Sequence, residues 1–336
     1  MILKIANGDN KIEQDILAAD IGATKTNIAL CHWDGNDLLI SNEATYKTKN
    51  FTDAGSLIDE FIGNDELPAK ICLAVAGPVQ ENKVTLTNIN WQIDGDQIAK
   101  QFHREVLLIN DLEATAYSLA VLDSKDIHSI HQGERGSKGN VGIIAPGTGL
   151  GEAGLYFNGG GYHPFATEGG HSSFAPRIGI DIELYHFIKR NFEHVSWERI
   201  ISGPGICTMY DFLLHVKERE EPSWIKEKML AHDKASVISE NATECAICKE
   251  TMDMFIRYLA EESGNLVLKF KATGGLFIGG GIVPHLVSII HEDYFLKHFS
   301  GFGRLKDLLQ AVPISIILNK KAALFGAAYF GVQYDK

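Results

Sequence analysis

The sequence predicts an α/β protein of two domains, and three observations support this prediction. Short apolar runs bounded by glycine or proline alternate with segments that carry apolar residues at helical spacing, which is typical of buried sheets covered by helices. The chain has 336 residues, more than one hydrophobic core usually holds. A strand, a glycine-bearing turn and a second strand are expected around Gly22 and again around Gly147.

The elements expected in the first half follow from these apolar runs. A strand, a turn at Gly22 and a second strand are predicted over 15–30. The segment 53–62 has apolar residues at helical spacing, and 70–76 is a near-continuous apolar run typical of a buried strand. The other elements expected here are a strand over 38–45, a short helix over 93–102, a strand over 106–109 and a helix over 112–122.

The second half begins with the same pattern. A strand, a turn and a strand are predicted over 140–155, and an offset of 125 residues places Gly147 on Gly22 and Leu155 on Leu30. This similarity of pattern suggests two related α/β halves. The elements expected after it are a long helix over 242–270, a strand and glycine turn over 273–284, a strand over 314–318 and a helix over 320–330.

The composition is that of an ordinary globular protein with an acidic surface. The formal net charge is −12, which disfavours nucleic acid and anionic membranes as partners. No run of about 18 apolar residues occurs, and the charged residues scattered through 1–16 exclude a signal peptide. We therefore expect a soluble, cytoplasmic protein that binds neither nucleic acid nor membrane.

The five cysteines form an odd, sparse set that indicates reduced thiols in a cytosol. Cys245 and Cys248 form a CxxC pair within a segment expected to be helical. Because no second pair or histidine has zinc spacing, we interpret them as ordinary helix cysteines, with a metal or redox role as the alternative.

The first glycine turn contains the residues Asp20-Ile-Gly-Ala-Thr-Lys25. It matches neither the Walker A pattern nor a dinucleotide fingerprint, because a strand rather than a helix follows it. A carboxylate at the end of a strand, followed by small residues and Thr24, suits a phosphate clasp in which Asp20 holds Mg²⁺ through water. The alternative is a hairpin whose turn simply needs glycine.

Two later glycine turns have the same kind of chemistry. The alternating glycines of Gly147-Thr148-Gly149 would let a turn wrap around terminal phosphates. The run 279–281 consists of glycines, so a flat base could lie against the backbone there. The alternative for the third run is a tight turn between a strand and a helix.

Asn110 and Asp111 follow a predicted buried strand. Asp111 could be the general base that a kinase aims at a substrate hydroxyl, or it could be an N-cap of the next helix. Glu168 and His171 flank two glycines and, with Glu198, offer many donors and acceptors for the ring of hydroxyls on a sugar. A zinc site is the alternative for these three residues, although the spacing is not that of HExxH.

The order of these motifs resembles the bacterial glucokinases of the hexokinase–actin superfamily, over Leu17 to Tyr329. The motifs are DIGATKTN, LAVAGPV, LTNINW, INDLEA, PGTGLG, EGGHSSFAP, VSWERIISGPG and FIGGGIVP. The resemblance implies a two-domain hexokinase/actin-like (ribonuclease H-like) fold with duplicated sheet halves and a cleft that closes on glucose. The implied domains are a small one over 1–111 with 319–336 and a large one over 112–318.

The resemblance also implies ATP-dependent phosphorylation of glucose to glucose 6-phosphate, feeding glycolysis, in a homodimer that uses Mg²⁺. Asp111 would be the catalytic base. The residues implied to bind the sugar are Asn110, Glu168, His171, Glu198, Thr87 and Asn88. The residues implied to bind ATP are Ala19, Asp20, Ile21, Gly22, Ala23, Thr24, Gly147, Thr148, Gly149, Gly279 and Gly280, with Asp20 holding Mg²⁺ through water.

The first turn departs from the family pattern DxGGTNxR at Ala23, Lys25 and Asn27. Ala23 requires a loop that avoids positive φ there, and Lys25 adds a charge that could help ATP bind. A lysine at this position also resembles the repressor/open-reading-frame/kinase sugar kinases. The cysteine-rich motif of that group is, however, absent after His171. The alternatives that stay open are a kinase for mannose, fructose or glucosamine, and a sugar-binding regulator without catalysis.

Overall fold

The structure is a computed structural model that describes residues 2–6, 12–86, 89–134 and 138–334. The chain folds into two compact units, Met1–Asp126 with Ala153–Ala166 and Asn319–Lys336, and Ile127–Glu152 with Thr167–Leu318. The segments 112–126 and 153–166, which were expected in the large domain, belong to the first unit. Within the described ranges, no helix is long and apolar enough to cross a bilayer.

The first unit is built on a five-stranded sheet of order β3-β2-β1-β4-β7. Strands β1 and β2 are antiparallel, as are β2 and β3, whereas β1, β4 and β7 are parallel. The inner strands are buried on both faces, which explains their near-continuous apolar sequence. The strands are β1 (Gln14–Ile21), β2 (Lys25–Trp33), β3 (Leu38–Lys47), β4 (Lys70–Val75) and β7 (Glu105–Asn110).

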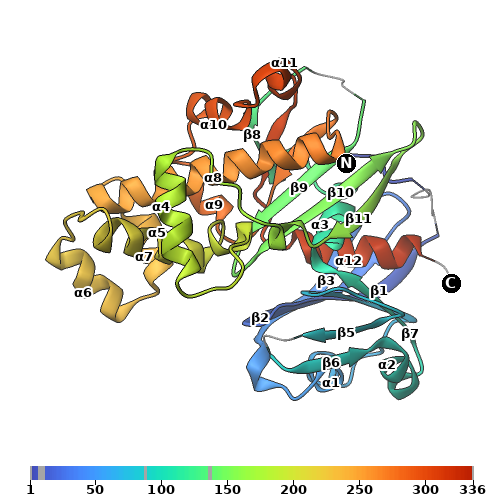
Figure 1. Ribbon diagram of the computed structural model, residues 1–336. Helices are drawn as coiled ribbons and strands as arrows, with labels where there is room; N and C mark the ends of the chain where they lie inside the picture. The colour runs from blue at the N-terminus through green and yellow to red at the C-terminus, as the bar shows by residue number, and fades with distance from the viewer. Residues whose placement is uncertain (1, 7–11, 87–88, 135–137, 335–336) are drawn as a thin grey trace. The chain divides into compact units, whose positions relative to one another are not determined.

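Helices cover both faces of this sheet, as Figure 1 shows. Leu17 and Ala19 of β1 belong to one hydrophobic cluster with residues of α1 and α2. Ile16 points to the opposite face, where it lies against Gly331 of α12. The remaining elements are η1 (Thr48–Asn50), α1 (Ala54–Ile62), the ribbon β5 (Lys83–Leu86) and β6 (Trp91–Asp94), α2 (Gly95–Phe102), α3 (Asp111–Ser118), η2 (Ser124–Asp126) and α12 (Ala322–Gln333).

Helix α12 packs closely against α3, and a glycine makes this possible. A Cβ on Gly326 would overlap the carbonyl of Ala114, so the two helices can approach only because that side chain is missing. This packing of α3 against α12 keeps the segment 112–126, which follows β7, in the first unit.

The second unit contains most of a six-stranded sheet of order β11-β10-β9-β12-β13-β8. The chain leaves the unit within β10, after Glu152, and re-enters it within β11, at Thr167. Strands β9, β12 and β13 are parallel, and β8 is antiparallel to β13. The strands are β8 (Ile127–His131), β9 (Val141–Pro146), β10 (Leu150–Phe157), β11 (Tyr162–Thr167), β12 (Gly275–Ile278) and β13 (Ile314–Ile317).

The long helix α8 (Ala246–Phe270) runs along one face of this sheet and is the centre of the main hydrophobic cluster. Its Leu266 side chain packs on Gly142 of β9. The other helical elements are η3 (Gly169–His171), α4 (Gly179–Lys189), η4 (Trp197–Arg199), α5 (Gly203–His215), α6 (Ser223–Ala231), α7 (Lys234–Glu240), α9 (Val283–Leu286), α10 (Glu292–Phe299), η5 (Gly303–Leu305) and α11 (Lys306–Gln310).

Several expected helices differ at their ends, among them the last one, which was expected over 320–330 and runs over Ala322–Gln333. The helix expected over 93–102 begins at Gly95, because Trp91–Asp94 pairs with β5 as a strand. The helix expected over 112–122 ends at Ser118, and the one expected over 242–270 begins at Ala246. Cys245 is the N-cap of α8, and Cys245 and Cys248 are both buried free thiols.

Candidate active site

The parallel strands of the first unit bring two of the motifs to one edge. Ile21 of β1 is in register with Val75 of β4, and Val75 with Asn110 of β7. The carboxyl ends of these strands therefore lie side by side, which is where open α/β sheets bind ligands. The loop 22–24 and the pair Asn110-Asp111 leave the sheet at this edge.

Asn110, and not Asp111, is the N-cap of α3. Its Oδ1 accepts hydrogen bonds from the backbone N–H of Leu112 at 3.0 Å and of Glu113 at 3.2 Å, while its Nδ2 donates to the Gly77 carbonyl at 3.1 Å. An amide has two acceptor sites and two donor hydrogens, so these bonds use all but one of its hydrogens. The N-cap role considered for Asp111 is therefore filled by Asn110.

Asp111 is the first residue of α3 and is half-buried. Its Oδ1 accepts a hydrogen bond from the Leu112 N–H at 2.9 Å, which fixes the rotamer of the carboxylate. This arrangement holds a proton acceptor at the carboxyl edge of the sheet.

The first glycine turn is a tight connection between β1 and β2. The Gly22 N–H donates to the Lys25 carbonyl at 3.1 Å, and a Cβ on Gly22 would lie 3.0 Å from that oxygen. Ala23 is not among the described residues with positive φ. This confirms the expectation that the loop avoids positive φ at this alanine. The loop accommodates the extra methyl group without backbone strain.

Asp20 lies at the end of β1 in a polar but poorly solvated place. Burial raises the pKa of its carboxyl, while a hydrogen bond from Asn27 Nδ2 at 3.3 Å and the charge of Lys25 lower it. Asn27 Oδ1 in turn accepts a hydrogen bond from Thr45 at 3.0 Å. A single carboxylate of this kind suits Mg²⁺ held largely through water rather than in an all-protein cage.

Thr48 braces this loop, a role that the sequence did not reveal. The fully buried hydroxyl of Thr48 donates to the Gly22 carbonyl at 2.7 Å and lies 3.0 Å from the Thr26 hydroxyl. Its backbone N–H donates to the Thr24 carbonyl at 3.2 Å. A threonine two strands further along the chain carries no motif, so only the tertiary contact identifies it.

Replacing Thr48 by Val should loosen the first loop while keeping its shape. The change leaves the Gly22 carbonyl without its side-chain donor, which should cost about 1–3 kcal/mol of unfolding free energy, and we expect the KM for nucleotide to rise several-fold. Urea denaturation and steady-state kinetics measure the two effects. Thr52→Val, at an exposed hydroxyl nearby, is the control, and equal behaviour of the two variants would contradict the bracing role.

In the second unit, the glycine turns after β9 and β12 also share one edge. Ile278 of β12 is in register with Ile144 of β9, and the Gly279 N–H donates to the Ile144 carbonyl at 2.8 Å. Gly280 has a φ of 85°, and a Cβ there would overlap the Pro146 carbonyl. The turn therefore needs glycine at position 280, where it crosses directly over the end of β9.

The turn Gly147-Thr148-Gly149 is held from two sides. The Gly147 N–H donates to the Gly149 carbonyl at 2.8 Å, and the Gly147 carbonyl accepts from the Gly203 N–H of α5 at 2.9 Å. Glu198 reaches the other side, where its Oε2 accepts from the Leu150 N–H at 3.1 Å. The glutamate expected to bind sugar thus also contacts the turn expected to bind phosphate.

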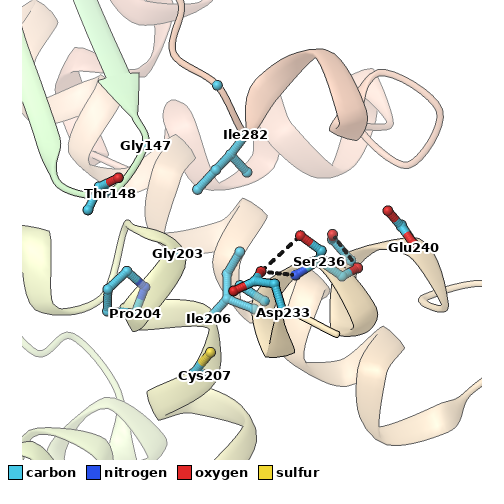
Figure 2. A pocket seen from close by; sticks show the side chains of 13 residues that line it. Gly147, Thr148, Gly203, Pro204, Ile206, Cys207, Asp233, Ser236, Glu240 and Ile282 are labelled. Atoms are coloured by element: carbon cyan, nitrogen blue, oxygen red, sulfur yellow. Dashed lines mark hydrogen bonds between the residues drawn. The ribbon is translucent and has the colours of Figure 1, made fainter. Parts of the chain in front are cut away.

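A cavity of about 530 Å³ opens beside this turn (Figure 2). Ile206 of α5 and Ile282 face it from opposite walls, and the N-terminus of α5 forms part of its rim. Asp233 caps α7, accepting from the Ser236 N–H at 2.9 Å and its hydroxyl at 2.8 Å. The lining residues are Gly147, Thr148, Gly203, Pro204, Ile206, Cys207, Asp233, Ala235, Ser236, Ser239, Glu240, Gly281 and Ile282.

This cavity contains two of the expected nucleotide residues, Gly147 and Thr148, and Gly280 directly precedes the lining residue Gly281. The sequence did not point to the walls from α5 and α7. The only available signal for α5 was the Ser202-Gly-Pro-Gly205 opening, in which Ser202 is the N-cap and accepts from the Gly205 N–H at 3.1 Å. The N–H groups of this first turn are already used, because Gly203 donates to the Gly147 carbonyl, Pro204 has no N–H and Gly205 donates to Ser202.

The residues Glu168 and His171 lie on η3 or directly before it, and both are exposed. Their Oε2 and Nε2 atoms are 3.9 Å apart. The following segment pairs with the one before Glu198, since the Phe174 N–H donates to Val195 at 2.9 Å and the Trp197 N–H to Ser172 at 3.1 Å. This pairing brings Glu168, His171 and Glu198 into one neighbourhood of the second unit.

The other expected site residues are placed as follows. Ala19 and Ile21 are buried in β1, with their side chains in the hydrophobic cluster, so only their backbone can face a ligand. Thr24 is exposed. Thr87 and Asn88 lie outside the described residues. Among the residues that the structure describes, no group of three or more His, Cys, Asp or Glu is arranged to hold a metal ion.

Comparisons with known proteins identify the family. A family model described as Glucokinase matches residues 17–334. The chain is 34% identical to a glucokinase of Nostoc punctiforme, over 93% of this chain and 97% of that protein. It is 35% identical to a glucokinase of Caulobacter vibrioides, over 93% of each protein.

Among solved structures, the crystal structure of a glucokinase from an Antarctic psychrotroph is similar. It has a TM-score of 0.80 and 31% identity, with 96% of this chain and 99% of that chain covered. The family match spans nearly the whole chain and includes both sheet edges. The chain belongs to the glucokinase family.

Proposed function

We propose that this protein transfers the γ-phosphoryl group of ATP to the 6-hydroxyl of glucose. The observation that carries the proposal is Asp111, a carboxylate fixed at the carboxyl edge of three parallel strands and relieved of capping by Asn110. Membership of the glucokinase family supports the reaction. The single remaining amide hydrogen of Asn110 could donate to a sugar oxygen beside the reacting hydroxyl.

In the proposed reaction, Asp111 accepts the proton of the 6-hydroxyl as the new O–P bond forms and the bond from the γ-phosphorus to the bridging oxygen breaks. The base need not be strong, because phosphoryl transfer depends mainly on positioning and on neutralising charge. Bound Mg²⁺ would neutralise charge on the phosphates, and Asp20 is the residue proposed to hold it through water. Glu168, His171 and Glu198 are proposed to bind the sugar hydroxyls.

The cavity of the second unit is proposed to hold the adenosine, with the base between Ile206 and Ile282. The turn 147–149 is proposed to wrap around the phosphate oxygens. Gly279 and Gly280 would keep side chains out of this space. The first loop, 20–24, is proposed to bind phosphate as well.

We further propose a cytoplasmic homodimer that feeds glycolysis. The five cysteines are free thiols, four of them buried, which fits a reducing compartment. Size-exclusion chromatography with light scattering tests the dimer directly, since a monomer mass would contradict it.

The proposed function is tested by supplying ATP and Mg²⁺ with glucose, mannose, fructose or glucosamine and following ADP release. We expect fast turnover with glucose, because a site that hydrogen-bonds a hydroxyl discriminates strongly between sugars. Turnover with another hexose only would keep the mechanism and change the substrate. Sugar binding without turnover would contradict the enzyme and favour a sugar-binding regulator. A second assay replaces ATP by ADP or polyphosphate and measures the sugar phosphate, and turnover with one of these donors but not with ATP would contradict ATP as the donor.

A further inference from the structure

A buried pair of carboxyl groups lies directly beneath the loop that carries Glu168 and His171. Glu152 ends the second unit's part of β10 and is 1% exposed, and Glu262 of α8 is fully buried. The two side chains are in hydrogen-bond contact. Two carboxylates cannot share such a contact, because neither offers a hydrogen, so one of the pair must be protonated.

The partners of each carboxyl group show where the proton resides. Glu262 Oε1 accepts from Lys269 Nζ at 2.8 Å, and its Oε2 accepts from Asn265 Nδ2 at 2.7 Å. Glu152 has no such donors, and its buried Oε1 lacks a hydrogen-bond partner among the described residues. A buried carboxylate without donors is costly, whereas a neutral acid tolerates an unused lone pair better. Glu262 is therefore the carboxylate and Glu152 the acid that donates to it.

Glu152 is also in contact with the loop itself. A Cβ on Gly169 would overlap Glu152 Oε2, so the carboxyl group fills the space that a side chain at position 169 would need. The Thr167 hydroxyl donates to the Glu152 carbonyl at 2.9 Å and accepts from the Gly169 N–H at 3.2 Å. The backbone between Glu168 and His171 thus rests on this residue.

We propose that Glu152 is a positioning residue for the sugar-binding loop, acting as a neutral carboxylic acid that ties the loop 167–171 to helix α8 through Glu262. This inference rests on the proposed function, since it assigns a support to the residues proposed to bind sugar. Deprotonation of Glu152 would place two carboxylates in contact, and the loop, which is the exposed side of the pair, would move away.

The electrostatic surroundings set the pH at which this happens. Burial, followed by the charge of Glu262, raises the pKa of Glu152 to about 8, and Lys269 opposes this shift. Burial also raises the pKa of Glu262, against its bonds to Lys269 and Asn265. From the loop side, the Glu152 carboxyl group faces the backbone of Gly169, which carries no charge. The KM for glucose should therefore increase at pH values above about 8. The charge of the sugar itself does not change there.

The test compares Glu152→Gln with wild type across pH. An amide can still donate to Glu262 but cannot ionise, so Glu152→Gln should keep a wild-type KM for glucose near neutral pH and hold it at about pH 9. Wild type should show a KM about tenfold higher at pH 9 than at pH 7, because the competent, protonated fraction falls about tenfold. Glu152→Ala should raise the KM at every pH and alter kcat less.

The matched control is Glu261→Gln on the same helix. Glu261 is also buried, and burial raises the pKa of its carboxyl too, but it faces Arg257, Arg177 and His298 rather than the loop. Its variant should keep the wild-type pH profile of the KM. The same profile for wild type and Glu152→Gln, or an unchanged KM in Glu152→Ala, would overturn the proposal.

A second measurement needs no activity. The pKa of Glu152 is higher in the folded chain than its ordinary value of 4.5. The stability from its protonation is therefore complete below about pH 4.5 and is lost as pH rises through about 8. Between about pH 5.5 and 8.5, wild type should lose more unfolding free energy than Glu152→Gln. Equal losses would contradict the neutral acid, whereas failure of wild type to bind any hexose in calorimetry would contradict the proposed function alone.

Discussion

Replacing Asp111 by Asn is expected to lower kcat with glucose by roughly a thousandfold, within the range of about 10²–10⁴ that a positioned general base contributes. Asparagine keeps the size of the side chain and can still accept from the Leu112 N–H that fixes the carboxylate. It cannot take the proton of the 6-hydroxyl. The KM for glucose should change little, since the proposed sugar contacts remain, and initial-rate kinetics separate the two constants.

The control for this variant is Glu113→Gln in the same first turn of α3. Glu113 is half-buried, and burial raises the pKa of its carboxyl, but no role in the reaction is assigned to it. Its variant should retain most of the wild-type kcat. A small effect of Asp111→Asn, or an equal effect of both variants, would show that Asp111 is not the base.

Replacing Gly280 by Ala is expected to impair both folding and nucleotide binding. The residue has a φ of 85°, where alanine is strained, and the added Cβ would overlap the Pro146 carbonyl at the end of β9. Strain of this kind costs about 1–3 kcal/mol, and relief of the overlap must move the turn that begins at Gly147. We expect the unfolding free energy to fall by about 2 kcal/mol or more and the KM for ATP to rise about tenfold.

Gly281→Ala is the matched control, because a Cβ at Gly281 meets nothing within 4 Å and its φ is not positive. Its unfolding free energy should stay within about 0.5 kcal/mol of wild type. Denaturant titration compares the two variants, and kinetics at saturating glucose give the KM for ATP. A Gly280→Ala protein as stable as Gly281→Ala would contradict the crossing of this turn over β9.

Much of the fold could be predicted from the sequence because its signals are local. The apolar runs at 70–76 and 140–146 are strands, and the glycine turns follow strands at the edge of a sheet. The ends of elements were less certain. Residues 91–94 form a strand only because they pair with β5, and the apolar spacing that continues into 95–102 gives no sign of that partner.

The candidate site divides in the same way. The order of the motifs, from the Asp20 loop to the 279–281 run, predicts which residues carry the chemistry, and their place after strands puts them at the sheet edges. Which side chain does which task was a different matter. Asn110 and Asp111 are adjacent in sequence, and only the hydrogen bonds of the folded chain show that Asn110 caps α3 while Asp111 does not.

The sequence by itself determined the α/β class, the glycine turns and the family, because these depend on neighbouring residues and on the order of motifs. Only the tertiary structure decided that Thr48 braces the first loop, that α5 and α7 wall the cavity, and that Glu152 meets Glu262 under the loop 167–171. These contacts join residues far apart in the chain, and a buried hydroxyl or carboxyl group has no pattern of its own. Its role is set by the atoms that packing brings to it.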